Sequence, residues 1–433
     1  MLRQANRPRA RTTLILCMLL HGFTHAYGTM LVPLYLLMVR DLKLTGVKQA
    51  SLIVTLYGLV YALGSYGAGV LADRFNRKAL LGIGLLGNAL AIVAMGLTRQ
   101  YEMLIALGAL AGAFGTLFHP AANALATEHF HKSPGMAIGI MGMGSGLGFF
   151  AGPQYAGWRA QSAQWNFGAI ANWQKPCVEL GVIGILAGII FLLIAREVRP
   201  KLSPRPSNGL SDASAHPRLG AHLRARMIAI ASVLMFRDFA GIASLSLLSV
   251  YLQKSLGFDV KRAGFTIGAI MLLSIVVNPI AVWLSPRERR LPMLVLVLIA
   301  SGIVLCVVPL FAAVWVLPLM CGFQTFSLSS YALSDASILE RIEPNVRGRA
   351  IGLLLTIAGA FASTAPFVVG FWTDFLGSRA SHQIAYLPIF GTVAAMMVIA
   401  ALAAPLIARL GSFKGPAIEP ITEMAPMSLE VVG

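Results

Sequence analysis

The segment Gly69-Val-Leu-Ala-Asp-Arg-Phe-Asn-Arg-Lys78 lies between two long apolar runs, residues 47–71 and 79–98. A polar loop this short between two runs of membrane length predicts a tight helical hairpin. Gly69 predicts a close approach of two helices, because it carries no side chain. Asn76 tolerates the left-handed backbone that a sharp reversal needs, so we expect that geometry there.

The composition excludes an ordinary soluble protein. Of the 433 residues, 57% are hydrophobic and only 12% are charged. The formal charge of +17 would suggest nucleic acid in a soluble protein, but here the basic residues fall between apolar runs. We therefore expect a lipid bilayer as the partner and no nucleic acid. The four cysteines form no CxxC pair, which argues against a disulfide framework.

Apolar runs of membrane length predict an all-α membrane protein with twelve transmembrane helices. Lys and Arg are more than twice as frequent in the tails and even-numbered loops as in the other loops. This asymmetry predicts that both termini are cytoplasmic. The predicted spans are residues 12–38, 47–71, 79–98, 102–128, 134–157, 177–195, 226–253, 261–285, 291–311, 314–338, 347–374 and 386–410.

The chain also repeats itself, which predicts two pseudo-symmetric six-helix halves. One constant shift in numbering aligns Gly135-Met-Ala-Ile-Gly139 with Gly348-Arg-Ala-Ile-Gly352, and the same shift aligns Pro153 with Pro366. Such duplication predicts a binding site between the halves near the middle of the membrane. The predicted divisions are an N-terminal half 1–195, a linker 196–225 rich in Pro, Ser and Arg, a C-terminal half 226–410 and a cytoplasmic tail 411–433.

The hairpin segment, with its place between the second and third spans, resembles the signature of the major facilitator superfamily. The resemblance implies twelve helices, alternating access and a site in the plane between the halves. It also implies that Asp73 closes the cytoplasmic side by contacting the start of span eleven together with Arg347 or Arg349. The remaining gating residues that it suggests are Arg74 and Arg77.

Span five carries Gly144-Ser-Gly-Leu-Gly148-Phe-Phe-Ala-Gly152-Pro153, which is similar to the glycine-rich pattern of antiporter branches of this superfamily. Plain helix packing through the glycines is the alternative interpretation. On the antiporter interpretation, Gly152 and Pro153 take part in gating. Phe118-His-Pro-Ala121, late in span four, resembles the fosmidomycin-resistance branch of efflux proteins.

Polar side chains inside the spans are candidate substrate and coupling groups, because burying them in a membrane is costly. His21 and His25 are four residues apart in span one, and His119 and Asn123 repeat this spacing in span four. Neutral histidines bonded to a neighbouring helix are the alternative. No metal site is predicted, because ligands would have to come from different helices and no spacing demonstrates that.

Arg237 and Asp238 lie deep in span seven. The shift that aligns Leu31-Val-Pro-Leu-Tyr-Leu36 with Leu247-Leu-Ser-Val-Tyr-Leu252 also places Arg237 on His21. We expect Arg237 to bind substrate, with Asp238, His21 and His119 as coupling groups, because a charge in the middle of a membrane is costly to keep. A structural ion pair is the alternative interpretation. Asp335 in span ten is a candidate gate or a solvated helix end.

Between spans five and six, Trp158, Trp165 and Trp173 recur among polar neighbours. This pattern predicts a helix lying on the outer membrane interface, either as an anchor or as a lid.

These features predict a secondary active transporter in a bacterial inner membrane, working as a monomer, without a cofactor and without enzymatic activity. No phosphate-binding Gly-x4-Gly-Lys-Ser/Thr loop is present in the sequence. Proton-coupled export of a small organic compound is the first interpretation. Import or exchange of small anionic metabolites is the second, because Arg237 is a natural anion partner. A membrane sensor that does not transport is the third.

Overall fold

The computed structural model describes residues 7–130, 134–162, 170–197, 219–275, 277–343 and 346–411, and over these ranges the chain is helical without a β-strand. The helices are α1 (Arg7–Thr29), α2 (Tyr35–Asp41), α3 (Val47–Arg74), α4 (Arg77–Leu97), α5 (Tyr101–Gly115), α6 (Phe118–His129), α7 (Pro134–Gln161), α8 (Lys175–Ile194), α9 (Ala221–Lys254), α10 (Val260–Leu272), α11 (Val277–Leu284), α12 (Arg290–Val307), α13 (Ala313–Leu339), α14 (Arg347–Ala362), α15 (Ala365–Phe375), α16 (Leu387–Ala400) and α17 (Ala403–Ala408).

Eleven helical segments of the described chain are long and apolar enough to cross a membrane. The twelfth predicted span, 261–285, is divided into α10, a 3-10 turn Leu273–Ile275 and α11, with residue 276 outside the described ranges. The predicted all-helical membrane fold is therefore confirmed. Several spans are interrupted just before a proline that lies in the first turn of the next helix, as at Pro33 and Pro366. Proline has no backbone N–H and cannot donate the hydrogen bond of a continuous helix.

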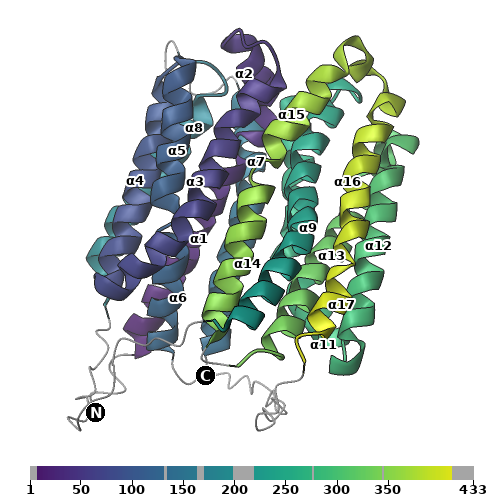
Figure 1. Cartoon of the computed structure of the whole chain (residues 1–433). Coiled ribbons are helices and arrows are strands. Elements are labelled where there is room, and N and C mark those ends of the chain that lie inside the picture. The colour runs from purple at the N-terminus through teal and green to yellow at the C-terminus, as the bar shows by residue number, and fades with distance from the viewer. Residues whose placement is uncertain are drawn as a thin grey trace, which may run out of the picture.

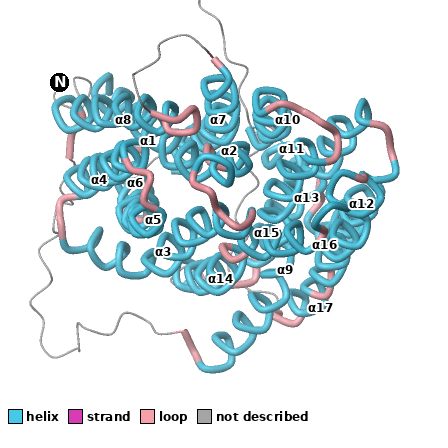
Figure 2. Tube along the Cα trace, turned by 90° about the horizontal axis from the view of Figure 1, so that it is seen from above, coloured by secondary structure: helices cyan, strands magenta, loops and turns pink. Residues whose placement is uncertain are grey.

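The helices form two groups that lie side by side (Figures 1 and 2). The N-terminal group is α1–α8 and the C-terminal group is α9–α17, and residues 198–218 between them are outside the described ranges. The predicted division into two domains remains a prediction. In the view of Figure 1, α1 and α14 begin at the lower end of the bundle, and α3 begins at the upper end.

The two groups are in close contact at the upper end. A Cβ atom added to Gly157 of α7 would lie 3.2 Å from the Cα of Gly264 in α10, so these two glycines let the helices touch. The carboxylate of Asp374 in α15 accepts hydrogen bonds from the amides of Val47 (2.8 Å) and Lys48 (2.9 Å) at the start of α3. The upper end of the interface is therefore closed.

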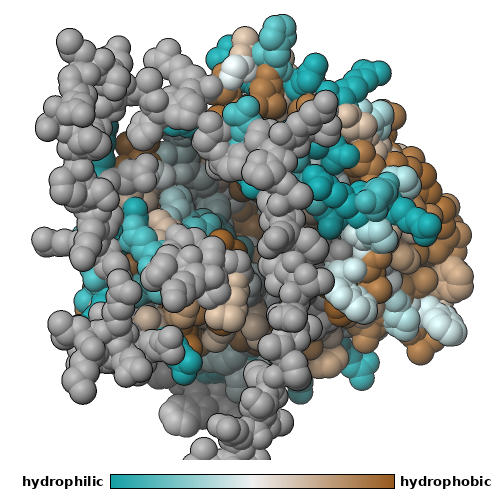
Figure 3. Space-filling model, turned by 90° about the horizontal axis from the view of Figure 1, so that it is seen from below, coloured by the Kyte–Doolittle hydropathy of each residue, from teal (hydrophilic) through white to brown (hydrophobic). Residues whose placement is uncertain are grey.

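The same helix faces separate toward the lower end. On α3, the stripe that contacts the C-terminal group at Ser51, Thr55 and Gly58 continues with the helical period to Tyr66, which is 79% exposed. A Cβ atom added to Gly352 of α14 would meet nothing within 4 Å. Seen from below, the uncovered flank of the molecule is largely hydrophobic and hydrophilic residues lie around the lower face (Figure 3). The described interface thus opens toward the lower end.

The hairpin between α3 and α4 differs from the prediction in two respects. Asn76 has φ −62° and ψ 118°, and its side chain caps α4 by accepting a hydrogen bond from the amide of Ala79 (2.7 Å). The expected left-handed geometry is wrong, because a residue that caps a helix N-terminus adopts an extended backbone. A Cβ atom added to Gly69 would meet nothing within 4 Å, so the expected close helix approach is absent there.

The contacts of a basic hairpin residue, Arg77, recur at the equivalent position of the C-terminal group. Arg77 forms an ion pair with Glu128 and donates to the carbonyl of Ala72 (3.2 Å). In the C-terminal group, Arg290 pairs with Glu340 and donates to the carbonyl of Ser285 (3.2 Å). The shift in numbering that aligns Pro153 with Pro366 also places Arg77 on Arg290, as the predicted repeat requires. The two groups therefore use equivalent contacts to connect neighbouring helices at the lower end.

The predicted interfacial helix around the tryptophans is wrong where the chain is described. Trp158 belongs to the last turn of α7 and is 43% exposed. Trp173 is fully buried just before α8, where it packs in the core and cannot anchor the chain in the membrane interface. Trp165 lies outside the described residues.

Candidate functional site

The three predicted histidines converge in the N-terminal group. His21 and His25 lie one turn apart on α1, and His119 lies in the first turn of α6. The fourth span is interrupted at Thr116 and Leu117, between α5 and α6, one turn ahead of Pro120. Interrupted spans of this kind often border binding sites in transporters. The ligating atoms of the three imidazoles lie within 4.8 Å of one another.

Hydrogen bonds fix the tautomers of the two histidines on α1. His21 Nδ1 lies 2.7 Å from the carbonyl oxygen of Met141 in α7. A carbonyl only accepts, so His21 carries its proton on Nδ1. His21 Nε2 is 3.0 Å from His25 Nε2. In the neutral pair, His25 therefore donates from Nε2, and its Nδ1 remains an acceptor.

Aromatic rings surround the imidazoles. His21 stacks on Phe118 with ring centroids 4.7 Å apart, and His25 contacts Phe149 at 4.4 Å. Tyr61 meets His119 edge to face at 6.0 Å. His21 is buried, whereas His25 and His119 are partly exposed. Aromatic walls with a few fixed polar groups are typical of small-molecule sites.

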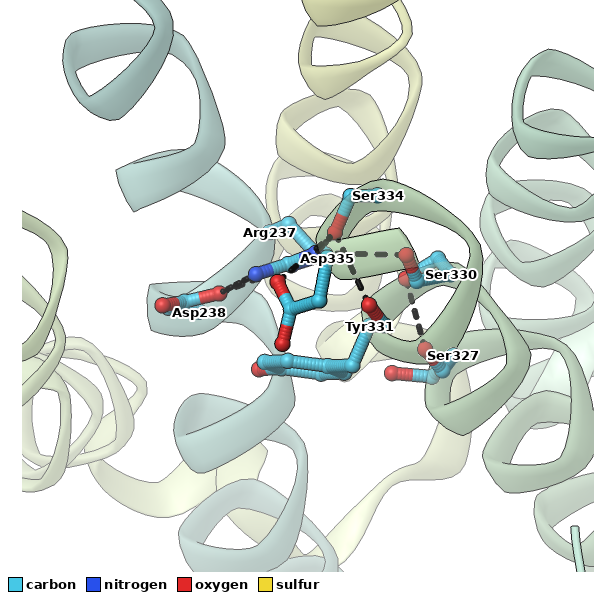
Figure 4. A network of polar contacts seen from close by, with 7 residues as sticks. All are labelled: Arg237, Asp238, Ser327, Ser330, Tyr331, Ser334 and Asp335. Atoms are coloured by element: carbon cyan, nitrogen blue, oxygen red, sulfur yellow. Dashed lines mark hydrogen bonds and ion pairs between the residues drawn. The ribbon is translucent and has the colours of Figure 1, made fainter. Parts of the chain in front are cut away.

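A second cluster lies in the C-terminal group, where α9 faces α13 (Figure 4). The guanidinium of Arg237 is 1% exposed and donates to Asp238 Oδ1 (2.8 Å) and to the hydroxyl of Ser334 (2.7 Å). Its central carbon lies 3.7 Å from the centroid of the Tyr331 ring. Arg237 is thus held by an ion pair, a hydrogen bond and a cation–π contact.

Asp335 belongs to the same cluster. It is partly buried, accepts a long hydrogen bond from the Ser334 hydroxyl (3.4 Å), and makes no ion pair among the described residues. Two carboxylates therefore share the neighbourhood of one guanidinium. Asp335 lies inside the polar network rather than at a solvated helix end.

The other predicted residues are dispersed. Asn123 lies one turn beyond His119 on α6 and is exposed. A Cβ atom added to Gly152 would lie 2.7 Å from the carbonyl oxygen of Ala26, so this glycine allows α7 to pack on α1. Pro153 lies within α7, which continues past it.

At the lower end, Arg74 and Arg349 are exposed. Arg347 donates to the carbonyl of Ile342 (3.0 Å). The side chain of Asp73 lies outside the described part of the structure, so its proposed contact with the start of span eleven remains a prediction.

Sequence reasoning missed two polar networks. Asn88 in α4 is 1% exposed and donates to Tyr57 (3.3 Å), whose hydroxyl donates to the carbonyl of Thr24 (3.1 Å). At the upper end, Glu179 of α8 accepts from Arg159 (2.7 Å) and Tyr155 (2.6 Å). Asn88 and Glu179 both fall within predicted spans. The criterion that selected Arg237, a costly polar group inside a span, applies to them equally.

A family model connects this architecture with known proteins. The model of the Major Facilitator Superfamily matches residues 14–366. The chain belongs to the major facilitator superfamily. The predicted family is confirmed over these residues.

Individual relatives are more distant. The chain is 28% identical over 262 residues to a probable nitrate/nitrite transporter, NarK2 of Mycobacterium tuberculosis, covering 59% of the chain and 61% of that protein. It thus spans about three fifths of this relative's length. It is 25% identical over 340 residues to a probable 4-methylmuconolactone transporter of Cupriavidus pinatubonensis, covering 76% of each. The multidrug resistance protein MdtG of Yersinia enterocolitica is 25% identical over 334 residues, covering 74% of each chain.

Solved structures show the same fold. A bacterial homologue of the human lysosomal transporter Spinster, in an inward-facing and occupied conformation, matches with a TM-score of 0.71 and 17% identity, covering 93% of this chain and 97% of that one. The nucleoside transporter NupG matches with a TM-score of 0.72 and 11% identity, covering 92% of this chain and 100% of that one. At these identities the likeness concerns the fold alone.

Proposed function

We propose that this protein is a proton-coupled secondary transporter that exports small organic compounds across a bacterial inner membrane. Substrate binds in the N-terminal group among His21, His25 and His119, where aromatic rings supply apolar contact and the imidazoles supply hydrogen bonds. The proton is carried in the C-terminal group. Alternating access then exposes both sites first to one side of the membrane and then to the other.

The coupling proposal rests on one observation: two carboxylates lie near the single guanidinium of Arg237. One guanidinium faces Asp238 directly, and Asp335 lies one residue from Ser334, which also binds the guanidinium. With both carboxylates ionised the cluster has a charge of −1, and uptake of one proton makes it neutral. A neutral cluster passes through a closed, low-dielectric state at lower cost than a charged one. Proton uptake and helix movement are thereby coupled.

Two features support the direction and substrate class. Relatives include a tetracenomycin C resistance and export protein of Streptomyces glaucescens, 32% identical over 146 residues, as well as MdtG. The aromatic contacts of His21 and His25 suit a compound with an apolar body. Of the two interpretations of the glycine pattern in α7, we favour helix packing, because these glycines contact α1 and α10.

Exchange of small anionic metabolites is the second candidate. It is favoured by Arg237 and by the relatives described as nitrate/nitrite and 4-methylmuconolactone transporters. In this proposal an anion replaces Asp238 as the partner of the guanidinium. Competition by inorganic anions for substrate binding distinguishes it, because an uncharged compound bound among the histidines is insensitive to them.

Transport in proteoliposomes tests the first proposal. We expect a pH gradient to drive accumulation of drug-like compounds, and Asp335→Asn to abolish this accumulation while counterflow without a gradient persists. Glu343→Gln, which changes an exposed acid just beyond α13, serves as the matched control and should behave as the unchanged chain. Gradient-driven transport by Asp335→Asn at the normal rate would exclude Asp335 as the proton carrier.

A further inference from the structure

Three imidazoles from two helices meet with a spacing close to that of metal ligands. His21 and His25 are four residues apart on one face of α1, a spacing at which two histidines can bind one metal ion. His119 adds a third ligand from α6, and all three ligating atoms lie within 4.8 Å of one another. Tetrahedral zinc, with bonds of about 2.0–2.1 Å, places its nitrogen ligands about 3.3 Å apart. Small side-chain rotations would therefore bring the three ring nitrogens to the spacing of zinc ligands.

The surroundings of His21 favour the same chemistry. Histidines that bind metals usually donate their other ring proton to a carbonyl or carboxylate, which fixes the ring and its tautomer. His21 does so, because its Nδ1 donates to the carbonyl of Met141 at 2.7 Å. Its Nε2 is consequently an acceptor and points toward His25 Nε2 at 3.0 Å. A backbone carbonyl of α7 thus holds one ligand in position.

We infer that His21, His25 and His119 form a binding site for a late first-row transition-metal dication, with Zn²⁺ as the probe. Neutral imidazole is a preferred ligand of these ions. On binding, the proton of His25 moves from Nε2 to Nδ1, so that the Nε2 lone pairs of both α1 histidines face the metal and no net proton is released. His25 and His119 are partly exposed, which leaves an open fourth position for water or another ligand.

The site ties α1 to α6 and, through Met141, to α7. Its ligands are all uncharged, so the bound ion keeps its double charge among aromatic rings. The binding itself does not rest on the proposed transport function. If both hold, Zn²⁺ occupies the imidazoles that are proposed to bind the organic compound, and it inhibits transport by competition.

Calorimetric titration of purified, tag-free protein with ZnCl₂ tests the inference. We expect one Zn²⁺ per chain, and at least a roughly tenfold loss of affinity in His119→Ala. His21→Asn keeps a donor for the Met141 carbonyl and removes the ligand, so it should lose affinity without losing the fold. His382→Ala, at an exposed histidine outside the cluster, is the matched control and should bind as the unchanged chain.

Thermal unfolding gives a second readout, because Zn²⁺ stabilises only the folded chain that binds it. Zn²⁺ should raise the Tm of the unchanged chain and of His382→Ala, but not of His119→Ala or His21→Asn. No binding up to about 1 mM Zn²⁺, which corresponds to only about −4 kcal/mol, would overturn the inference. Equal binding by a variant lacking all three histidines would overturn it too. Because neither readout requires transport, failure here and failure of the proposed function are distinguishable.

Discussion

Arg237 shows how one buried charged residue determines the interactions of its neighbours. Its guanidinium is 1% exposed, and its donors are directed at Asp238 and Ser334. Removing one partner of a buried ion pair leaves the other charge uncompensated, which costs far more than removing both partners. The stability of single and double variants therefore measures how far this pair is structural.

We expect Arg237→Ala to destabilise the protein by about 3–5 kcal/mol, because Asp238 then lacks its cation. The double variant Arg237→Ala with Asp238→Ala should recover most of that loss. Arg237→Lys keeps the charge but loses the fork that binds Asp238 and Ser334 together, so its stability should be intermediate. Arg40→Ala breaks an exposed pair with Asp41 and should change stability by less than about 1 kcal/mol.

Thermal unfolding and substrate binding are measured on the same variants. Stable single variants that fail to bind substrate would show that Arg237 contacts the substrate, as the sequence led us to expect. Recovery of both stability and transport in the double variant would instead make the pair purely structural.

At the residue scale, the sequence indicates candidate polar groups inside the spans, but it does not indicate which groups they contact. The depth of Arg237 in a span and the spacing of His21 and His25 are readable from the chain. His119 is readable as a candidate too, but its convergence with His21 and His25 and the contact of the Tyr331 ring with Arg237 are not, because they depend on how the helices pack. The prediction at Asn76 was wrong for a local reason, since capping a helix N-terminus competes with the left-handed turn.

At the scale of elements, α3 and the α14–α15 pair connect the two groups of helices. Asp374, in the last turn of α15, caps the start of α3 through the amides of Val47 and Lys48. A carboxylate at a helix N-terminus gains from both the hydrogen bonds and the helix dipole. Gly46 is required there, because a Cβ atom would overlap the carboxylate of Asp374. This contact holds the upper end closed.

We expect Asp374→Asn to weaken upper-end closure by about 1–2 kcal/mol, because the amide loses the charge and one acceptor. Gly46→Ala should act in the same direction by steric overlap. Distances between spin labels at the exposed positions Lys43 and Ser378 report the change, and the long-distance population should grow. Asp41→Asn, on the same end but paired with exposed Arg40, is the control. An unchanged distance distribution in both variants would exclude the contact as a closing device.

The predicted contact of Asp73 is the counterpart at the other end of α3. The stripe of α3 residues that faces the C-terminal group recurs at Ser51, Thr55 and Gly58, and the helical period continues through Tyr66 to position 73. If the lower end closes in another conformation, Asp73 meets the start of α14 as Asp374 meets the start of α3.

Asp73→Asn should therefore lower transport while leaving protein abundance nearly unchanged. It should also leave the Lys43–Ser378 label distances short, because the upper-end contact is intact. Transport assays on variants of equal abundance check this expectation, and full transport by Asp73→Asn would contradict the predicted closing contact of Asp73.

At the scale of the whole molecule, the membrane fold is readable from apolar runs, and the internal repeat returns in the Arg77–Glu128 and Arg290–Glu340 pairs. The sequence could not indicate which end of the bundle is closed. Both closures use contacts that the same chain encodes, so a preference between them is a small difference in free energy rather than a pattern of residues. The glycine contacts of α7 with α10 are visible only once the helices are placed.

Accessibility from each side of the membrane tests the open lower end and the predicted orientation together. Gly352 of α14 and Gly139 of α7 have open space around them, so a cysteine at either position should react with a membrane-impermeant maleimide. Cys306 and Cys321 are partly exposed and are replaced by serine, whereas Cys17 and Cys177 are buried and remain.

If the termini are cytoplasmic, Gly352→Cys and Gly139→Cys are labelled from the cytoplasmic side in inside-out vesicles. Ser378→Cys, in an exposed turn at the upper end, is labelled only in right-side-out vesicles. Protection of both glycine positions would mean that the lower end is closed in the membrane, and labelling of all three from one side would contradict the orientation of the ends.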